Sequence, residues 1–104
     1  MVREISPSDF QSRRAAGAVL LDVRDDWELA RAPVPGVVHI PMSQIAQRLG
    51  ELDPARETVV MCRSGGRSMR VAQFLEQQGF NSVANLTGGV LAWSREVDPS
   101  IPEY

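Results

Sequence analysis

The sequence has one cysteine and no long apolar run, and both shortages limit what the protein can be. A single cysteine excludes an intramolecular disulfide and a metal site built from several thiolates. No apolar stretch approaches the roughly 20 residues of a membrane-spanning helix. The first four residues also lack the apolar core of a signal peptide, so we expect a cytoplasmic protein that does not bind membranes.

The sequence also has little excess of one sign of charge over the other. The net charge is −2, and acidic and basic residues are interspersed along the chain. We therefore expect neither a nucleic acid nor an anionic membrane surface as a partner. The 104 residues, 43% of them hydrophobic, suffice for one compact domain over 1–104. No repeat, linker or oligomer interface is evident, so a monomer is expected.

Apolar segments typical of strands alternate with segments typical of helices. The predicted strands cover residues 2–5, 18–23, 37–40, 58–61 and 82–86. Helices are predicted from a cap at Ser6 to about Ala16, from Asp25 or Asp26 through Ala30, from a cap at Ser43 through Leu49, from about Ser68 to Gly79, and after Gly88-Gly89. Strands separated by helices pair in parallel through right-handed crossovers, which predicts an α/β fold with helices on both faces.

The lone cysteine stands between a predicted strand and a predicted helix. Gly65 and Gly66 allow a tight turn there, and Arg63 and Arg67 add fixed positive charge. Backbone N–H groups and the positive end of the helix dipole stabilise an anion at such a place, including a thiolate. A cysteine that only filled a core would need neither the glycines nor the arginines. We therefore interpret Cys62 as a nucleophile in an anion-binding loop.

Three segments, in this order, resemble the rhodanese family of sulfurtransferases in its single-domain form. They are residues 20–24 with 27–29, the Cys62 loop with Arg67-Ser68, and residues 87–93. The resemblance covers nearly the whole chain. It implies a doubly wound α/β domain with a largely parallel sheet of about five strands. It also implies transfer of sulfane sulfur through a cysteine persulfide, without a metal or organic cofactor.

Carried onto this chain, the resemblance makes Cys62 the residue that accepts the sulfur. The implied substrate-binding cradle consists of Arg63, Ser64, Gly65, Gly66, Arg67 and Ser68, the last of which opens the helix. The thiolate attacks the outer sulfur of a donor such as thiosulfate, and sulfite leaves. A thiophilic acceptor such as cyanide or a thiol then removes the sulfur. Because the chain has no second thiol, this acceptor must be external.

Two departures from the family pattern bear on the choice of donor. Ser64 stands at a loop position that is basic in some members that use thiosulfate. One cation fewer weakens the attraction for a doubly charged donor. The segment 32–36 reads Ala-Pro-Val-Pro-Gly where the family often has Gly-His-Ile-Pro-Gly, so the usual histidine is absent there. His39, the one histidine of the chain, is expected to be a surface or structural residue.

Other functions remain as alternatives. A cysteine phosphatase or arsenate reductase also uses a thiolate in an anion cradle, but the phosphatase loop is one residue longer than the four residues between Cys62 and Arg67. No candidate general acid is evident either. A sulfur carrier loaded by a partner protein, or a regulatory binding module, would have little thiosulfate activity. A module without activity would be expected to lose the cysteine or the loop arginines.

We interpret the remaining conspicuous residues as structural. Asp22 is expected to anchor loops by hydrogen bonding, and Arg24 to pair with Glu28 on the short helix. A carboxylate close to a thiol would oppose thiolate formation, so Asp22 is assigned no role as a base. Trp27 and Trp93 are expected to be packing residues.

Overall fold

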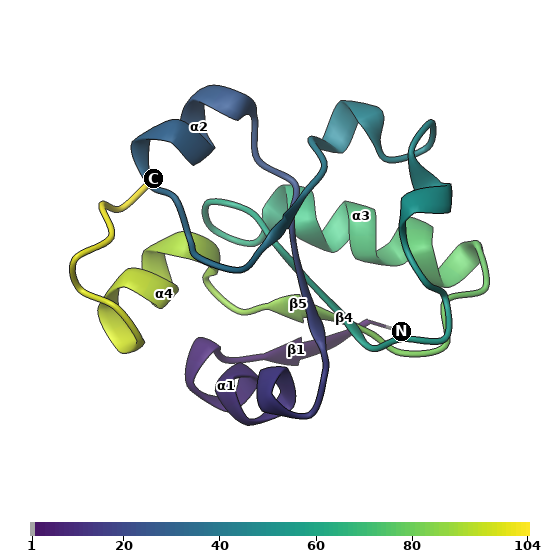
Figure 1. Ribbon diagram of the computed structural model, residues 1–104, viewed down its shortest axis with the longest axis horizontal. Helices are drawn as coiled ribbons and strands as arrows, with labels where there is room; N and C mark the ends of the chain where they lie inside the picture. Colours follow the sequence, from purple (N-terminus) through teal and green to yellow (C-terminus); the bar gives the residue numbers. More distant parts are fainter. Residues whose placement is uncertain (1) are drawn as a thin grey trace.

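A computed structural model describes residues 2–104 as a sheet with helices on both faces (Figure 1). The strands are β1 (Arg3–Ile5), β2 (Val19–Asp22), β3 (Val38–His39), β4 (Thr58–Met61) and β5 (Val83–Leu86). They lie in the order β1-β5-β4-β2-β3, and each neighbouring pair is parallel. The predicted doubly wound α/β fold with a parallel sheet of five strands is confirmed.

The chain has four α-helices within the described residues. They are α1 (Pro7–Ala15), α2 (Asp26–Arg31), α3 (Gly66–Gln77) and α4 (Gly89–Glu96). Three of them, α1, α3 and α4, cover the two faces of this sheet. On one face α1 meets α4, with the rings of Phe10 and Trp93 6.1 Å apart. On the other face α3 packs Val71 and Leu75 against the sheet. No helix within residues 2–104 combines the length and the apolar content that crossing a membrane requires.

The central strand β4 determines where the cysteine lies. All four of its residues are buried, because β2 and β5 flank it and helices cover both of its faces. Side chains alternate along a strand, so Val59 and Met61 join the core under α1 and α4. Val60 and Cys62 join the core under α3. Cys62 therefore emerges at the carboxyl edge of the sheet, directly below the start of α3.

The helix predicted from a cap at Ser43 is wrong. The segment instead forms two 3₁₀ turns, Met42–Gln44 and Leu49–Glu51, and the Ser43 side chain caps neither. Ile45 is buried, but Leu49 is only half-buried. So short a segment with one fully buried anchor gains too little packing to offset the cost of forming a longer helix.

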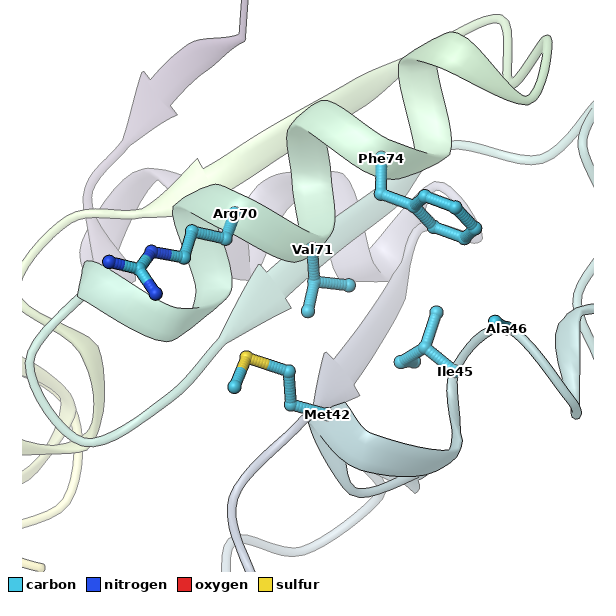
Figure 2. A pocket seen from close by; sticks show the side chains of 6 residues that line it. All are labelled: Met42, Ile45, Ala46, Arg70, Val71 and Phe74. Carbon is cyan, nitrogen blue, oxygen red and sulfur yellow. The ribbon is translucent and has the colours of Figure 1, made fainter.

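A hollow of about 200 Å³ lies between the first of these turns and α3 (Figure 2). Its walls are mainly apolar and come from Met42, Ile45, Ala46, Arg70, Val71 and Phe74. Cys62 does not line it. The hollow is thus a surface feature beside α3 and separate from the sulfur.

The two tryptophans differ in their surroundings. Trp93 is 2% exposed and packs in the core, as predicted. The prediction for Trp27 is wrong, because this side chain on α2 is 56% exposed. Its indole packs at 75° to the Tyr104 ring, with ring centroids 5.9 Å apart. The helix is six residues long, and the residue that it buries is Glu28.

Candidate active site

The Cys62 sulfur lies at the N-terminus of α3 and is almost completely enclosed. The residue is 1% exposed, and Sγ accepts a hydrogen bond from the Gly65 N–H at 3.1 Å. Gly65 aims its amide there by adopting a left-handed backbone with φ of 115°, which glycine adopts without strain. Gly66 is the first helical residue and needs no such backbone. The tight turn thus depends on Gly65 rather than on both glycines.

Several donors act on the thiol together. Burial alone raises the pKa of Cys62, but hydrogen bonds outweigh it and bring the pKa below its ordinary value. The hydrogen bonds that lower it are with the Ser68 side chain and with the backbone N–H groups of Ser68, Gly65 and Ser64. The N-terminal end of α3 adds its positive dipole. The surroundings therefore stabilise an anion on this sulfur.

A buried amide on the neighbouring strand supports this loop. Asn85 of β5 donates from Nδ2 to the Gly65 carbonyl at 3.1 Å and accepts from the Ser68 hydroxyl at 2.5 Å. The same Nδ2 donates to the Glu4 carboxylate on β1 at 3.2 Å. Sequence reasoning missed Asn85, although a polar residue within an apolar strand is a usable signal. Asn85 fixes both Gly65 and Ser68, which contribute donors to the sulfur.

The start of α4 holds the other side of the loop. The N–H groups of Val90 and Leu91 donate to the carbonyls of Cys62 and Arg63, at 2.9 and 3.2 Å. This close approach requires Gly89, because a Cβ at that position would lie 2.3 Å from the Cys62 carbonyl oxygen. The sequence showed the glycine pair at 88–89 without indicating what it contacts. Gly89 thus lets α4 pack directly against the backbone of Cys62 and Arg63.

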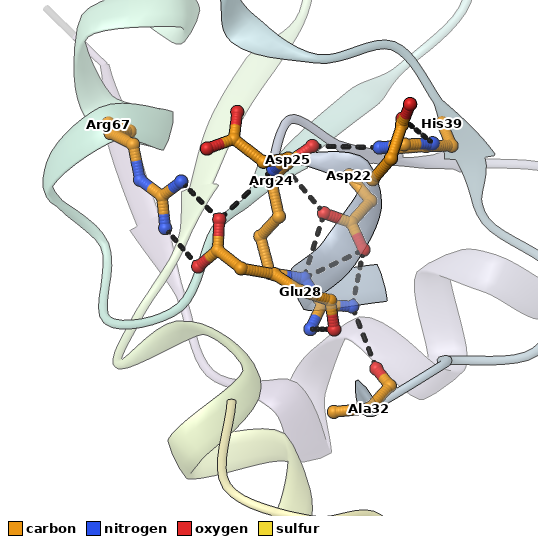
Figure 3. Close-up of polar contacts among 8 residues, drawn as sticks. Asp22, Arg24, Asp25, Glu28, Ala32, His39 and Arg67 are labelled. Atoms are coloured by element: carbon orange, nitrogen blue, oxygen red, sulfur yellow. Dashed lines mark hydrogen bonds and ion pairs between the residues drawn. The ribbon is translucent and has the colours of Figure 1, made fainter. Parts of the chain in front are cut away.

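Arg67 does not point its charge freely at the sulfur. Its guanidinium makes a bidentate ion pair with Glu28 on α2, with distances of 2.6 and 2.7 Å (Figure 3). Glu28 is 3% exposed and also accepts from the Asp25 N–H at 3.0 Å. The hydrogen bond from Arg67, more than its other contacts, lowers the pKa of Glu28. The same hydrogen bond raises the pKa of Arg67. The pair remains charged and ties α2 to α3.

The predicted pairing of Arg24 with the Glu28 side chain is wrong. Arg24 pairs with Asp22 at 2.7 Å, and both side chains are fully buried (Figure 3). Its guanidinium also donates to the backbone carbonyls of Glu28 and Ala32, at 3.3 and 2.8 Å. Asp22 lies only two residues away at the end of β2, while the Glu28 carboxylate is taken by Arg67. Asp22 thus anchors loops through Arg24, as a structural residue.

The other expected site residues have separate positions. Arg63 is exposed, and its guanidinium lies 5.7 Å from the centre of the Tyr104 ring rather than over the sulfur. His39 lies 2.7 Å from the Arg24 carbonyl through Nε2, in a structural contact. Within residues 2–104 no three His, Cys, Asp or Glu side chains are grouped so that they could hold a metal ion. The structure thus brings the backbone of the loop to Cys62, while the Arg67 side chain is paired with Glu28 and the Arg63 side chain lies beside Tyr104.

Comparison with known proteins gives consistent matches over this fold. The model of the rhodanese-like domain matches residues 6–96. A sulfurtransferase from Allochromatium vinosum is 37% identical over 103 residues, covering 97% of this chain and 96% of the relative. The thiosulfate sulfurtransferase GlpE from Pseudomonas syringae is 36% identical over 91 residues, covering 88% of this chain and 86% of the relative.

Solved structures and longer proteins match in the same way. A rhodanese-related protein from Thermoplasma volcanium has a TM-score of 0.85 at 28% identity, covering 98% of this chain and 99% of its own. The chloroplastic rhodanese-like/PpiC domain-containing protein 12 of Arabidopsis thaliana is 46% identical over 91 residues, or 84% of this chain. This chain spans only 30% of that longer relative.

Proposed function

Because this chain belongs to the rhodanese-like family, whose relatives support sulfur transfer in general, we propose that it moves sulfane sulfur through a persulfide on Cys62. The donor in this proposal is thiosulfate or a related anion, and the acceptor is cyanide or a thiol. The observation that carries the proposal is the enclosed Cys62 sulfur, 3.1 Å from the Gly65 amide at the start of α3. The name of the relative GlpE supports thiosulfate as the donor.

The proposed reaction has two displacements at sulfur. The Cys62 thiolate attacks the outer sulfur of thiosulfate, the S–S bond of the donor breaks, and sulfite leaves with its electron pair. The persulfide that forms carries a negative charge on its terminal sulfur. An acceptor nucleophile then bonds to that sulfur, and the Cys62–sulfur bond breaks to restore the thiolate. Fixed amides around the site stabilise each anion without having to move.

In this reaction the cradle acts mainly through its backbone. Amide groups of Ser64, Gly65 and Ser68 donate toward the Cys62 sulfur. Arg67 is assigned to holding the loop, because Glu28 neutralises its charge through two short hydrogen bonds. Its effect on an anionic donor is correspondingly small.

A sulfur carrier loaded by a partner protein is the second candidate. Two observations favour it: the thiol is 1% exposed, and Arg67 is already paired with a carboxylate. The first limits the access of a small dianion from solution to the thiol, and the second reduces the positive charge that would attract it. The two candidates share the Cys62 persulfide and differ in its source. Loading by a cysteine desulfurase, but not by thiosulfate, would select the carrier.

The proposal is tested by following thiocyanate formation from thiosulfate and cyanide. Cys62→Ser is expected to abolish transfer, because an alcohol cannot form the persulfide. Thermal unfolding of the variant serves as the control that the fold is retained. Transfer that survives in Cys62→Ser would exclude Cys62 as the sulfur-accepting residue.

A further inference from the structure

An aromatic ring and two arginines meet beside the Cys62 loop. The Tyr104 ring lies under the guanidinium of Arg31, 4.4 Å from its centre, and under that of Arg63 at 5.7 Å. The indole of Trp27 contacts the ring edge-on, at 5.9 Å and 75°. These residues come from α2, the loop and the C-terminal segment, which ends beside α2 in Figure 1. Three distant parts of the chain thus converge on one ring.

The two arginines differ from the others near the site in having no carboxylate partner. Arg24 is paired with Asp22, and Arg67 with Glu28. Within residues 2–104 neither Arg31 nor Arg63 forms an ion pair, and both are exposed. The positive charge that remains available at the rim of the loop therefore belongs to Arg31 and Arg63.

A ring can hold these charges without neutralising them. The face of an aromatic ring attracts a guanidinium, while the N–H groups at the guanidinium edge stay free to donate. Two long cationic side chains with nothing between them would repel each other and spread into solvent. Each would also have more rotamer entropy to lose on binding a ligand. Tyr104 offsets both effects.

We propose that Tyr104 is a positioning residue that holds Arg31 and Arg63 at the rim of the Cys62 loop, where the two arginines bind the charged end of an anionic sulfur donor. This deepens the proposed function and rests on it for the identity of the ligand. Tyr104 itself touches neither the donor nor the sulfur in this proposal. It acts through the two guanidinium groups.

The first test uses Cys62 as the probe and needs no turnover. Iodoacetate and iodoacetamide alkylate the same thiolate, but only iodoacetate is an anion. The rate constant for iodoacetate is divided by that for iodoacetamide, and this ratio is then divided by the same ratio for the urea-unfolded chain. The result reports positive charge at the mouth of the loop. Tyr104→Leu is expected to lower this ratio about threefold, the equivalent of one exposed cation–π contact. Tyr104→Phe keeps the ring and is expected to keep the ratio.

Arginine variants provide the controls. Arg63→Ala and Arg31→Ala should each lower the ratio. In the double variant that carries both substitutions, adding Tyr104→Leu should lower the ratio no further. Arg70→Ala removes an exposed arginine on the hollow side of α3, so it measures the effect of net charge alone. An unchanged ratio in Tyr104→Leu, or an equal fall in Arg70→Ala, would overturn the proposal.

Steady-state kinetics with thiosulfate at low ionic strength separate this proposal from the proposed function. Tyr104→Leu should raise KM about threefold and leave kcat unchanged, and Tyr104→Phe should behave as the wild type. If the wild type turns over thiosulfate and KM in Tyr104→Leu does not change, the positioning role is wrong while the proposed function stands. If the wild type does not use thiosulfate, that donor is wrong. The alkylation ratio then still decides whether Tyr104 holds the arginines.

Discussion

Replacing Gly89 with alanine tests whether α4 shapes the Cys62 loop. The new Cβ would lie 2.3 Å from the Cys62 carbonyl oxygen and 2.6 Å from that of Arg63. Both atoms are backbone, so no flexible side chain can move aside. Either the loop or α4 must shift by about 1 Å, as in an overpacked core. The hydrogen bonds from Val90 and Leu91 to these carbonyls would lengthen at the same time.

The magnitude follows from two costs. Gly89 has φ of 57°, where an L side chain costs about 1–2 kcal/mol. Overpacking adds about 1–3 kcal/mol. The free energy of unfolding is therefore expected to fall by about 2–5 kcal/mol, a large part of the 5–15 kcal/mol typical of a folded protein. The displaced loop should also lose part of its donor set around Cys62, so alkylation at neutral pH should slow.

Urea unfolding followed by tryptophan fluorescence measures the change, with Gly66→Ala as the matched control. Gly66 lies in the first turn of α3, and a Cβ there meets nothing within 4 Å. This control should be neutral or stabilise by up to about 1 kcal/mol. A Gly89→Ala protein as stable as the Gly66→Ala protein, with an unchanged alkylation rate, would refute the fit of α4 against Cys62.

Four further substitutions have expected outcomes. Glu28→Gln should lower the free energy of unfolding at pH 7 by about 1–3 kcal/mol. The fold lowers the pKa of Glu28 below 4.5. The Glu28 carboxylate therefore stabilises the folded state above that pH, and this contribution is lost as the pH falls through the folded pKa. Urea titrations should accordingly give variant and wild type the same free energy of unfolding in acid. Ser68→Ala removes a hydrogen-bond partner that lowers the pKa of Cys62, so the pH profile of Cys62 alkylation should move to higher pH, with a rate about fivefold lower at pH 7. An unmoved profile would contradict that contact. Trp93→Ala should lower the free energy of unfolding by about 3–5 kcal/mol and Trp27→Ala by less than about 1 kcal/mol, since only Trp93 is buried. Thermal unfolding measures both, and equal losses would contradict this difference.

The central strand and the position of Cys62 at its end could be predicted because their signals are local. An apolar run buried on both faces marks β4, and Cys62 follows it directly. The helix predicted at Ser43 failed for a reason that is not local, since only the tertiary contacts show that Leu49 is half-buried. A capping residue and apolar spacing did not guarantee enough packing there.

The supports of the loop could not be predicted, because each joins distant segments. Glu28 and Arg67 are 39 residues apart, and their pairing depends on how α2 lies at the edge of the sheet. Asn85 lies opposite Val60 in the β4–β5 register, which only strand order reveals. Gly89 is visible as a glycine, but its close approach to the Cys62 carbonyl requires the placement of α4. The sequence thus indicated Cys62 as the candidate, and the structure adds what holds its loop in place.

The central claim, a persulfide on Cys62, is tested most directly by intact-protein mass spectrometry after incubation with thiosulfate and again after cyanide. The account predicts that the wild type gains the mass of one sulfur atom and loses it to cyanide as thiocyanate, while Cys62→Ser gains nothing. If thiosulfate fails, the same measurement with a cysteine desulfurase as donor tests the carrier form of the claim. A wild-type protein that gains no sulfur from either donor, or a Cys62→Ser protein that gains it equally, would contradict the account.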